Sequence, residues 1–265
     1  MQAPEVLSLG VIIPVYNEEK NIKPLVTKVI VELKDVPHTI CLVDDGSRDQ
    51  TVPIIQSLQK EHPQIHLIQR TKTRSGCQRG GASLCALKWL VENTSHEVIT
   101  EVDADGAHRP EELLNGIRCI RLFDVDIVIA SKYLYTSVVQ GRPFSRRIVS
   151  FCYSLLARVL FNKHIRDYSN SFRFYSRRAA EYILKVSPHY TSPIYLLEVL
   201  VMLIAGGFQI LEIPTQYIER NEGSSKVKWT DVMKGFFCML NIAVQFRFKK
   251  YQIEHYGMAP RKGYR

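Results

Sequence analysis

Short apolar runs alternate with amphipathic stretches through the first 130 residues of the chain. The apolar runs predict buried strands over Leu9–Val15, His38–Asp44, Ile65–Gln69, Glu97–Val102 and Asp126–Ala130. Helical spacing of apolar residues predicts helices over about 18–35, 49–61, 79–93 and 110–121, two of them with start signals at Asp49 and Pro110. This alternation predicts an α/β fold, with right-handed crossovers, a mostly parallel sheet and helices on both of its faces.

The pattern changes after residue 130. We expect a loop over Tyr133–Phe144 and then a helix over Phe144–Phe161, which places Ile148, Phe151, Cys152, Leu155, Leu156 and Val159 along one face. The remaining elements are predicted as a polar turn over Arg166–Asn170, a strand over Phe172–Tyr175, helices over 176–186 and 193–205, a strand over Phe208–Ile218, a Gly/Ser loop over Asn221–Lys228 and a last helix over about Thr230–Lys250.

Polar residues stand where the predicted strands end, and ligands bind at the carboxyl ends of the strands in sheets of this kind. The first strand ends in Pro14 and is followed by Tyr16 and Glu18, with none of the glycines that a dinucleotide-binding turn needs. An aromatic ring beside carboxylates is suited to stacking on a base and bonding ribose hydroxyls. Acidic residues at this position also complement the dipole of a starting helix, so both interpretations stand.

The second predicted strand ends in Asp44 and Asp45, which a glycine and a serine follow. A carboxylate after a parallel strand can accept hydrogen bonds from a base or a ribose. A tight Asp-Gly turn that leads into a helix would use the same residues.

The fourth predicted strand is followed by Asp103 and Asp105. Two carboxylates two residues apart can converge on one hard divalent cation, and Mg²⁺ and Mn²⁺ prefer such oxygen ligands together with phosphates and water. The alternative is a pair of turn and capping aspartates ahead of the helix that starts at Pro110.

Taken together, these segments form an ordered pattern. VIIPVYNEEKNI (11–22), LVDDGSRDQT (42–51) and VDADGAHRPEEL (102–113) resemble the family 2 glycosyltransferases of the GT-A fold, which has a mostly parallel, Rossmann-like sheet. IASKYL (129–134), SRRIVS (145–150), DYSNSFRFY (167–175) and ERNEGSSK (219–226) resemble the dolichyl-phosphate mannose synthase branch, which includes bacterial polyprenyl-phosphate glycosyltransferases. The resemblance covers roughly residues 8–230, and a chance match of seven ordered blocks is implausible.

The resemblance implies a role for each matching residue. It assigns the nucleotide to Pro14, Tyr16, Glu18 and Asp44, with Asp45 and Ala104 beside them. It makes Asp103 and Asp105 catalytic residues and ligands of Mg²⁺ or Mn²⁺ under the donor diphosphate. It gives the acceptor phosphate to Arg146 and Ser150 and counts Lys132 among the binding residues. It makes Arg220 and Lys226 catalytic basic residues that close over the phosphates.

Three positions depart from this branch. Ala107 replaces a polar residue that can add a metal ligand, Lys132 replaces an arginine, and Ser171 replaces a glycine. Lysine keeps the charge but loses the bidentate geometry of arginine toward a phosphate. These substitutions leave the class of enzyme intact and affect the choice of acceptor.

The implied reaction is inverting transfer of a sugar from a UDP- or GDP-linked donor to a polyprenyl or dolichyl phosphate. An acceptor that is a sugar hydroxyl of a polysaccharide or lipopolysaccharide is the alternative, and it would need a base such as Asp167. A sugar-nucleotidyltransferase would want a glycine-rich basic loop after the first strand, and PVYNEE (14–19) is not one. A binding module without catalysis would not need the Asp103–Asp105 pair. We expect a catalytic domain over 1–228 and a C-terminal amphipathic helix with a basic tail over 229–265.

The chain carries a formal net charge of +9, which favours an anionic partner. Composition alone leaves nucleic acid, an acidic membrane surface and phosphorylated substrates open, and the resemblance favours the last two over nucleic acid. The apolar recurrence of Val232, Phe236, Met239, Leu240, Ala243 and Phe246, followed by basic residues, is typical of a helix lying on an anionic membrane. Such a helix could equally pack on the domain or on a second subunit.

The first ten residues lack the basic and apolar regions of a signal peptide. The six cysteines are scattered without metal-binding spacing and are expected to be reduced core residues. The longest uncharged runs are too short for a membrane-spanning helix. We therefore expect a cytoplasmic protein, peripheral on the cytoplasmic face of a membrane.

Overall fold

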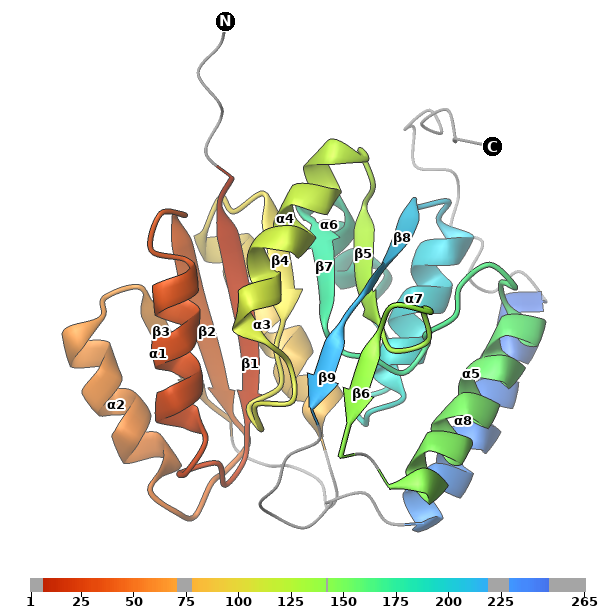
Figure 1. Ribbon diagram of the computed structural model, residues 1–265, viewed down its shortest axis with the longest axis horizontal. Helices are drawn as coiled ribbons and strands as arrows, with labels where there is room; N and C mark the ends of the chain where they lie inside the picture. Colours follow the sequence, from red (N-terminus) through yellow and green to blue (C-terminus); the bar gives the residue numbers. More distant parts are fainter. Residues whose placement is uncertain (1–6, 71–77, 142, 219–228, 248–265) are drawn as a thin grey trace, which may run out of the picture.

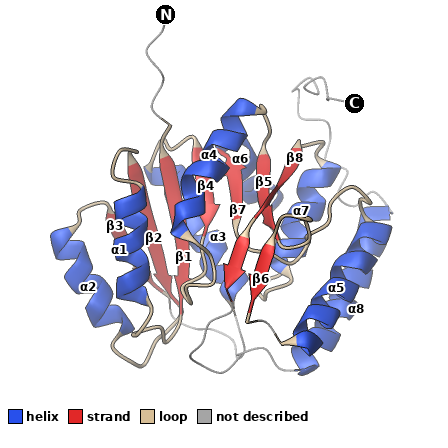
Figure 2. Cartoon of the chain, in the orientation of Figure 1, coloured by secondary structure: helices blue, strands red, loops and turns tan. Residues whose placement is uncertain are grey.

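The computed structural model describes residues 7–70, 78–141, 143–218 and 229–247. Its main sheet has seven strands in the order β3-β2-β1-β4-β7-β5-β8, with helices on both faces (Figures 1 and 2). The strands are β1 (Leu9–Val15), β2 (His38–Asp44), β3 (Ile65–Gln69), β4 (Val98–Glu101), β5 (Ile127–Ser131), β7 (Arg173–Ser176) and β8 (Ile210–Pro214). Only β7 runs antiparallel to its neighbours β4 and β5, so the expected α/β fold with a mostly parallel sheet is confirmed.

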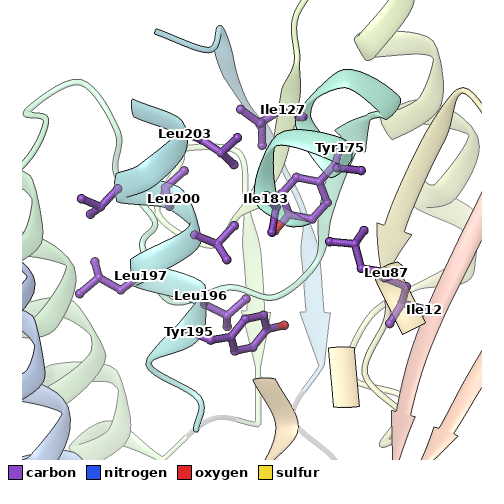
Figure 3. Packing of buried hydrophobic residues seen from close by; sticks show 14 of the residues in the cluster. Ile12, Leu87, Ile127, Tyr175, Ile183, Tyr195, Leu196, Leu197, Leu200 and Leu203 are labelled. Atoms are coloured by element: carbon purple, nitrogen blue, oxygen red, sulfur yellow. The ribbon is translucent and has the colours of Figure 1, made fainter. Parts of the chain in front are cut away.

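Each face of the sheet has its own apolar core, because side chains alternate along a strand. In β1, Val11 and Ile13 enter one core and Ile12 enters the other. The first core lies under α1 (Ile22–Glu32), α2 (Thr51–Glu61) and α4 (Leu113–Leu122). A short 3₁₀ turn (Pro110–Glu112) leads directly into α4. The second lies under α3 (Arg79–Asn93), α6 (Arg177–Val186) and α7 (Tyr195–Ala205), and Figure 3 shows its close packing.

Two further helices, α5 (Phe144–Leu160) and α8 (Trp229–Arg247), lie side by side at one end of the sheet (Figure 1). Edge-on ring contacts join Tyr153 to Phe236 and Phe161 to Phe246, each with ring centroids 5.7 Å apart. In α8, Met239 is fully buried, whereas Leu240 is half exposed. The predicted apolar face of α8 therefore lies mostly against the protein.

The apolar face of α5 points the other way. The residues that α5 buries are small or polar, namely Ser150, Ser154 and Ala157. The exposed side chains include Ile148 at 46%, Phe151 at 53%, Leu155 at 45% and Val159 at 76%. A core-facing amphipathic helix would show the reverse pattern, so this face is turned away from the fold.

Three expectations about the second half were wrong. The predicted loop over Tyr133–Phe144 contains a strand, β6 (Val138–Gln140), which pairs with β9 (Gln216–Ile218) in a separate two-stranded sheet. The predicted strand over Phe208–Ile218 is therefore two strands, because the chain leaves β8 at Pro214 and enters the small sheet two residues later. Cys152 is exposed on α5 rather than part of a core.

None of the helices in the described residues is long and apolar enough to cross a membrane. The expected boundary between residues 228 and 229 adjoins the range 219–228, which lies outside the described residues. The division into a domain over 1–228 and a C-terminal part over 229–265 stays a prediction.

Candidate active site

The loops that follow β1 and β2 are cross-linked. The Asn17 N–H donates to Ser47 Oγ at 2.9 Å, and Asn17 Oδ1 accepts from the Arg48 N–H at 2.8 Å. Glu19 Oε2 accepts from the Gln50 N–H at 3.0 Å. Asn17 has φ of 53°, a left-handed conformation that Asn tolerates better than most residues. These bonds hold two loops in a fixed relation at the carboxyl ends of neighbouring strands.

Pro14, Tyr16 and Glu18 lie in and after β1, at this edge of the sheet. Pro14 and Tyr16 are half-buried. Glu18 is 9% exposed, and its Oε2 accepts from Asn21 Nδ2 at 2.8 Å beside the start of α1. The Glu18 N–H donates to Thr51 Oγ1 at 2.8 Å. Glu18 thus supports the start of the helix, and Tyr16 remains the ring that can stack on a base.

Asp44 and Asp45 end β2. The carboxylate of Asp44 accepts from the backbone N–H groups of Gly46 and Ser47 at 3.1–3.2 Å, which is the geometry of an Asp-Gly turn. Asp45 Oδ1 lies 3.2 Å from Arg70 Nη1, in an ion pair that lacks hydrogen-bond geometry. Both side chains are buried. The contacts of Asp44 are those of the tight Asp-Gly turn that the sequence offered as an alternative to nucleotide binding.

Asp103 and Asp105 follow β4, with the side chain of Asp103 16% exposed. Asp103 Oδ1 accepts from Ser171 Oγ at 2.8 Å and from Arg79 Nη2. Burial would raise the pKa of Asp103, but the Arg79 guanidinium outweighs this and holds the pKa well below its usual value. Asp105 Oδ1 accepts from the Ala107 N–H at 3.1 Å, and Ala104 is buried between the two carboxylates. The first aspartate is therefore an anion throughout the physiological pH range.

The buried His108 side chain hydrogen-bonds to the backbone of the turn that holds Asp103 and Asp105. Its Nδ1 accepts from the Asp103 N–H at 3.1 Å, its Nε2 lies 3.2 Å from Asn170 Oδ1, and its ring stacks on Phe172. Burial lowers the pKa of His108, and the neighbouring Asp103 opposes that shift. Because Nδ1 accepts a bond from the backbone, Nε2 carries the proton of a neutral ring.

The segment Asp167–Ser171 joins this acidic turn to the start of α5. Ser171 and Asn170 contact Asp103 and His108, as described above. At the other end, Ser169 Oγ lies 3.2 Å from Ser150 Oγ, and Ser150 Oγ lies 2.6 Å from the Tyr133 hydroxyl. One short stretch of chain thus links the predicted metal ligands to the predicted acceptor residues.

Lys132 and Arg146 are the two predicted cationic site residues that lie within the described part of the chain. The Lys132 ammonium lies 5.1 Å from the centre of the Tyr217 ring. Its positive charge helps to lower the pKa of Asp167 and, together with burial, the pKa of His108. Arg146 lies in the first turn of α5, one helical turn before Ser150, so the two side chains share a face. The segment Asp167–Ser171 therefore connects both Lys132 and Ser150 to the acidic turn, and Arg146 lies one helical turn before Ser150.

Asp167 is fully buried, and both of its oxygens accept hydrogen bonds from the protein. Its Oδ1 accepts from Ser169 N, Ser169 Oγ and Asn170 N, each at 2.9 Å, and its Oδ2 accepts from the Lys132 N–H at 2.9 Å. Burial would raise the pKa of Asp167, but Lys132 and these donors lower it. Both oxygens of Asp167 are therefore already engaged in holding this segment.

Sequence reasoning missed Arg79 and Glu101. Glu101 ends β4 and is 2% exposed, and its Oε1 accepts from Arg79 Nε at 3.1 Å, Arg79 Nη2 at 2.8 Å and Ser83 Oγ at 2.9 Å. The Tyr195 hydroxyl donates a hydrogen bond to Glu101 Oε2. The available signal was a carboxylate inside an otherwise apolar strand, since such a group needs a buried partner.

The residues present suit a hard divalent cation that is shared with a substrate. Within the described ranges, no three His, Cys, Asp or Glu side chains gather into a metal site. The Asp103–Asp105 pair would therefore need oxygens from a diphosphate and water to complete an octahedral Mg²⁺ or Mn²⁺. Arg220 and Lys226, predicted to close over the phosphates, lie outside the described residues.

The open, mostly parallel sheet sets the carboxylates of Asp44 and Asp103 at the carboxyl ends of its strands, where ligands bind in sheets of this kind. The sequence profile described as "Glycosyl transferase family 2" matches residues 10–184. The chain therefore belongs to glycosyl transferase family 2, which confirms the family resemblance.

The chain is similar to two mannose transferases. It is 29% identical over 91% of its length to "Polyprenol monophosphomannose synthase" of Mycolicibacterium smegmatis and covers 88% of that protein. It is 31% identical over 82% of its length to "Undecaprenyl-phosphate mannosyltransferase" of Micrococcus luteus and covers 86% of it.

A solved structure of the Mycobacterium tuberculosis glucosyl-3-phosphoglycerate synthase, in complex with Mn²⁺, UDP and glucosyl-3-phosphoglycerate, has the same fold. Its TM-score is 0.59 at 15% identity, over 95% of this chain and 82% of that one. The expected GT-A architecture is thereby confirmed.

Proposed function

We propose that the protein transfers a sugar, with inversion, from a UDP- or GDP-sugar to the phosphate of a polyprenyl or dolichyl phosphate. The observation that carries this proposal is the link between an acidic turn, at Asp103 and Asp105, and a set of cationic and hydroxyl-bearing residues, Lys132, Arg146 and Ser150. The segment Asp167–Ser171 ties the two together. By their names, the first of the two relatives above makes polyprenol monophosphomannose, and the second is a mannosyltransferase of undecaprenyl phosphate.

On the donor side, Tyr16, Asp44 and Asp45 flank the space for the nucleotide, while Asp103 and Asp105 would hold Mg²⁺ or Mn²⁺. The metal, when bound, neutralises the negative charge that grows on the leaving diphosphate. The chain's own part is to keep Asp103 ionised and oriented, through Arg79 and Ser171. Arg220 and Lys226 would add positive charge over the phosphates.

On the acceptor side, the state of Asp167 favours a phosphate over a sugar hydroxyl. A hydroxyl acceptor must lose a proton to a general base, whereas a phosphate monoester, with a second pKa near 6, is largely ionised at pH 7. The base considered for a hydroxyl was Asp167, and its oxygens already accept four hydrogen bonds. A nucleophile that arrives ionised needs no such base.

The outward apolar face of α5 supports peripheral contact with an anionic bilayer. A polyprenyl chain stays in the membrane, so the acceptor residues have to reach the membrane surface. Arg146 and Ser150 lie on α5 itself, which carries the exposed Ile148, Phe151 and Leu155 on its outward side. A helix with an exposed apolar face and basic residues matches the interface between acyl chains and anionic headgroups. We propose a location at the cytoplasmic face of a membrane on these grounds.

A donor and acceptor screen tests the proposal. The purified protein is incubated with UDP- and GDP-linked hexoses, a short polyprenyl phosphate in detergent, and Mg²⁺ or Mn²⁺, and lipid-linked sugar is extracted and identified. We expect one donor to give a polyprenyl-phosphate sugar in the presence of metal and none after chelation. Transfer to a soluble polysaccharide but to no lipid phosphate would contradict the acceptor assignment.

A further inference from the structure

Glu101 and Arg79 form a buried charge pair directly behind the predicted metal ligands. The two residues are brought together from the end of β4 and the first residue of α3. Gly80, the next residue of α3, makes this approach possible, because a Cβ there would lie 2.6 Å from the Tyr195 ring. That ring lies in the core, with its hydroxyl pointing away from α7 (Figure 3), and it donates to Glu101.

Glu101 fixes the guanidinium of Arg79 in place. Two nitrogens of Arg79, Nε and Nη2, donate to Glu101 Oε1, at 3.1 and 2.8 Å. Because Glu101 is 2% exposed, losing its cationic partner would leave a buried, uncompensated charge. Arg79 is itself only 22% exposed. Moving the Arg79 guanidinium away from Glu101 would therefore cost free energy, even when a cation binds nearby.

The same guanidinium also donates through Nη2 to Asp103 Oδ1, which Ser171 contacts as well. One oxygen of the first aspartate is thus committed to groups of the protein. A divalent cation at the Asp103–Asp105 pair would have to share Asp103 with a fixed positive charge. Like charges at short range in a partly buried site repel strongly.

We propose that Arg79, anchored by Glu101, is the resident counter-cation of the Asp103–Asp105 pair and couples metal binding to the donor. It is a positioning residue: it holds Asp103 oriented, and its fixed positive charge weakens binding of a free divalent ion. A donor diphosphate adds negative charge and further oxygen ligands, which offset the repulsion, so metal and nucleotide bind together. This inference rests on the proposed function, because it takes Asp103 and Asp105 as metal ligands.

Binding of Mn²⁺ tests the coupling without any measurement of activity. The dissociation constant of Mn²⁺ is measured by the EPR signal of the free ion, with the protein alone and with UDP or GDP. The informative variant is the double substitution Arg79→Met with Glu101→Gln. It removes one positive and one negative charge, and glutamine can still meet Ser83 and Tyr195. Lys88→Met, an exposed lysine on the same helix, is the matched control for loss of a positive charge.

In the wild type and in Lys88→Met we expect weak Mn²⁺ binding that the nucleotide tightens, by a factor within the roughly 5–150-fold range typical of coupled sites. The double variant should bind Mn²⁺ alone about tenfold more tightly than the wild type and lose a similar factor of nucleotide coupling. If the double variant does not fold, Arg79→Lys takes its place, because an ammonium lacks the fork that bridges Glu101 and Asp103. It should tighten Mn²⁺ binding about threefold, within the lower part of that range.

Two other results have different meanings. A folded double variant whose Mn²⁺ affinity equals or falls below that of a nucleotide-responsive wild type overturns the role of Arg79 and leaves the proposed function standing. If neither the wild type nor the variants bind Mn²⁺, with or without either nucleotide, the metal assignment in the proposed function fails, and the inference fails with it.

Discussion

The two sides of the candidate site differ in charge and in the way they are held. On the proposed donor side, carboxylates end β2 and follow β4. Hydrogen bonds between the loops after β1 and β2 hold the first of these positions, and a hydrogen bond within its own turn holds Asp105. On the acceptor side, Lys132, Arg146 and Ser150 present cations and a hydroxyl, and two of them lie on α5, whose apolar face is exposed. An acidic side needs a metal to accept a diphosphate, whereas a basic side can take a phosphate directly. The contrast suits a reaction in which two different phosphorylated substrates meet.

The largest effect is expected where the acidic side is broken. Asp105→Ala should lower the transfer rate by at least about a thousandfold, because metal stabilisation of the leaving group is worth several kcal/mol. The fold should survive, since Asp105 is half-buried at the surface of the site. Rates with saturating donor and acceptor, together with the melting temperature, check this. A variant that retains full activity, or wild-type activity that a chelator does not reduce, would rule out the metal assignment.

Arg146→Ala probes the basic side. Loss of a charge-assisted phosphate contact should cost about 1.5–3 kcal/mol, or roughly 10- to 150-fold in kcat/KM for the acceptor. The affinity for the donor should stay near that of the wild type. Arg147→Ala, its exposed neighbour on α5, is the matched control. A loss confined to donor binding would show that Arg146 contacts the donor rather than the acceptor phosphate, and would contradict the prediction.

Asp167→Asn tests whether the link between the two sides is structural. The amide would leave some of the four donors around Asp167 unpaired, at a cost of roughly 1–3 kcal/mol in the free energy of unfolding at pH 7. The pKa of Asp167 is lowered in the folded protein, despite burial, by Lys132 and the hydrogen bonds. Its ionised form therefore stabilises the fold above the unfolded pKa of about 3.9, and that stability is lost as the pH falls through the folded value.

Denaturant unfolding at several pH values measures this. The difference in stability between the wild type and Asp167→Asn should be full at pH 7 and should shrink below about pH 4. A difference independent of pH would contradict the assigned charge. Complete loss of activity in a stable, folded Asp167→Asn would instead revive its role as a general base.

The smallest effect concerns the outward face of α5. Phe151→Ser should weaken binding to vesicles that contain anionic lipid by about 1 kcal/mol, roughly fivefold, because the ring is only half exposed and gains only part of its full burial. The melting temperature should hardly change. Salt should also weaken vesicle binding, since surface charges are screened within about 10 Å at 0.1 M. If the wild-type protein stays in the supernatant when vesicles are sedimented at low salt, the membrane proposal fails.

The parallel half of the fold could be predicted because its strands are continuous apolar runs that end in polar residues. Leu9–Val15, His38–Asp44 and Ile65–Gln69 were predicted with their observed bounds for this reason. β6 escaped prediction because it has three residues and lies at the surface, where no apolar alternation marks it. The direction of the apolar face of α5 could not be read either, since periodicity shows that a helix is amphipathic but not what its apolar side meets.

The candidate site divides in the same way. The sequence predicted Asp44, Asp103 and Asp105 as site residues, because each lies at or just after the end of a predicted strand. The pair of Glu101 and Arg79 depends on a contact between residues 22 positions apart, in a strand and the helix before it. Tyr195 joins them from still farther along the chain. Contacts of this kind are set by how α3 and α7 pack on the sheet, which local patterns do not encode.

The central claim is that an ionised lipid phosphate receives the sugar. The most direct measurement compares two matched acceptors, a polyprenyl phosphate and the corresponding polyprenol, with the same nucleotide-sugar and Mn²⁺. The account predicts rapid formation of a sugar linked through phosphate to the lipid, and no product from the alcohol, because Asp167, the base considered for a hydroxyl acceptor, already accepts four hydrogen bonds. Equal or faster transfer to the alcohol, or to a soluble sugar hydroxyl, would contradict it.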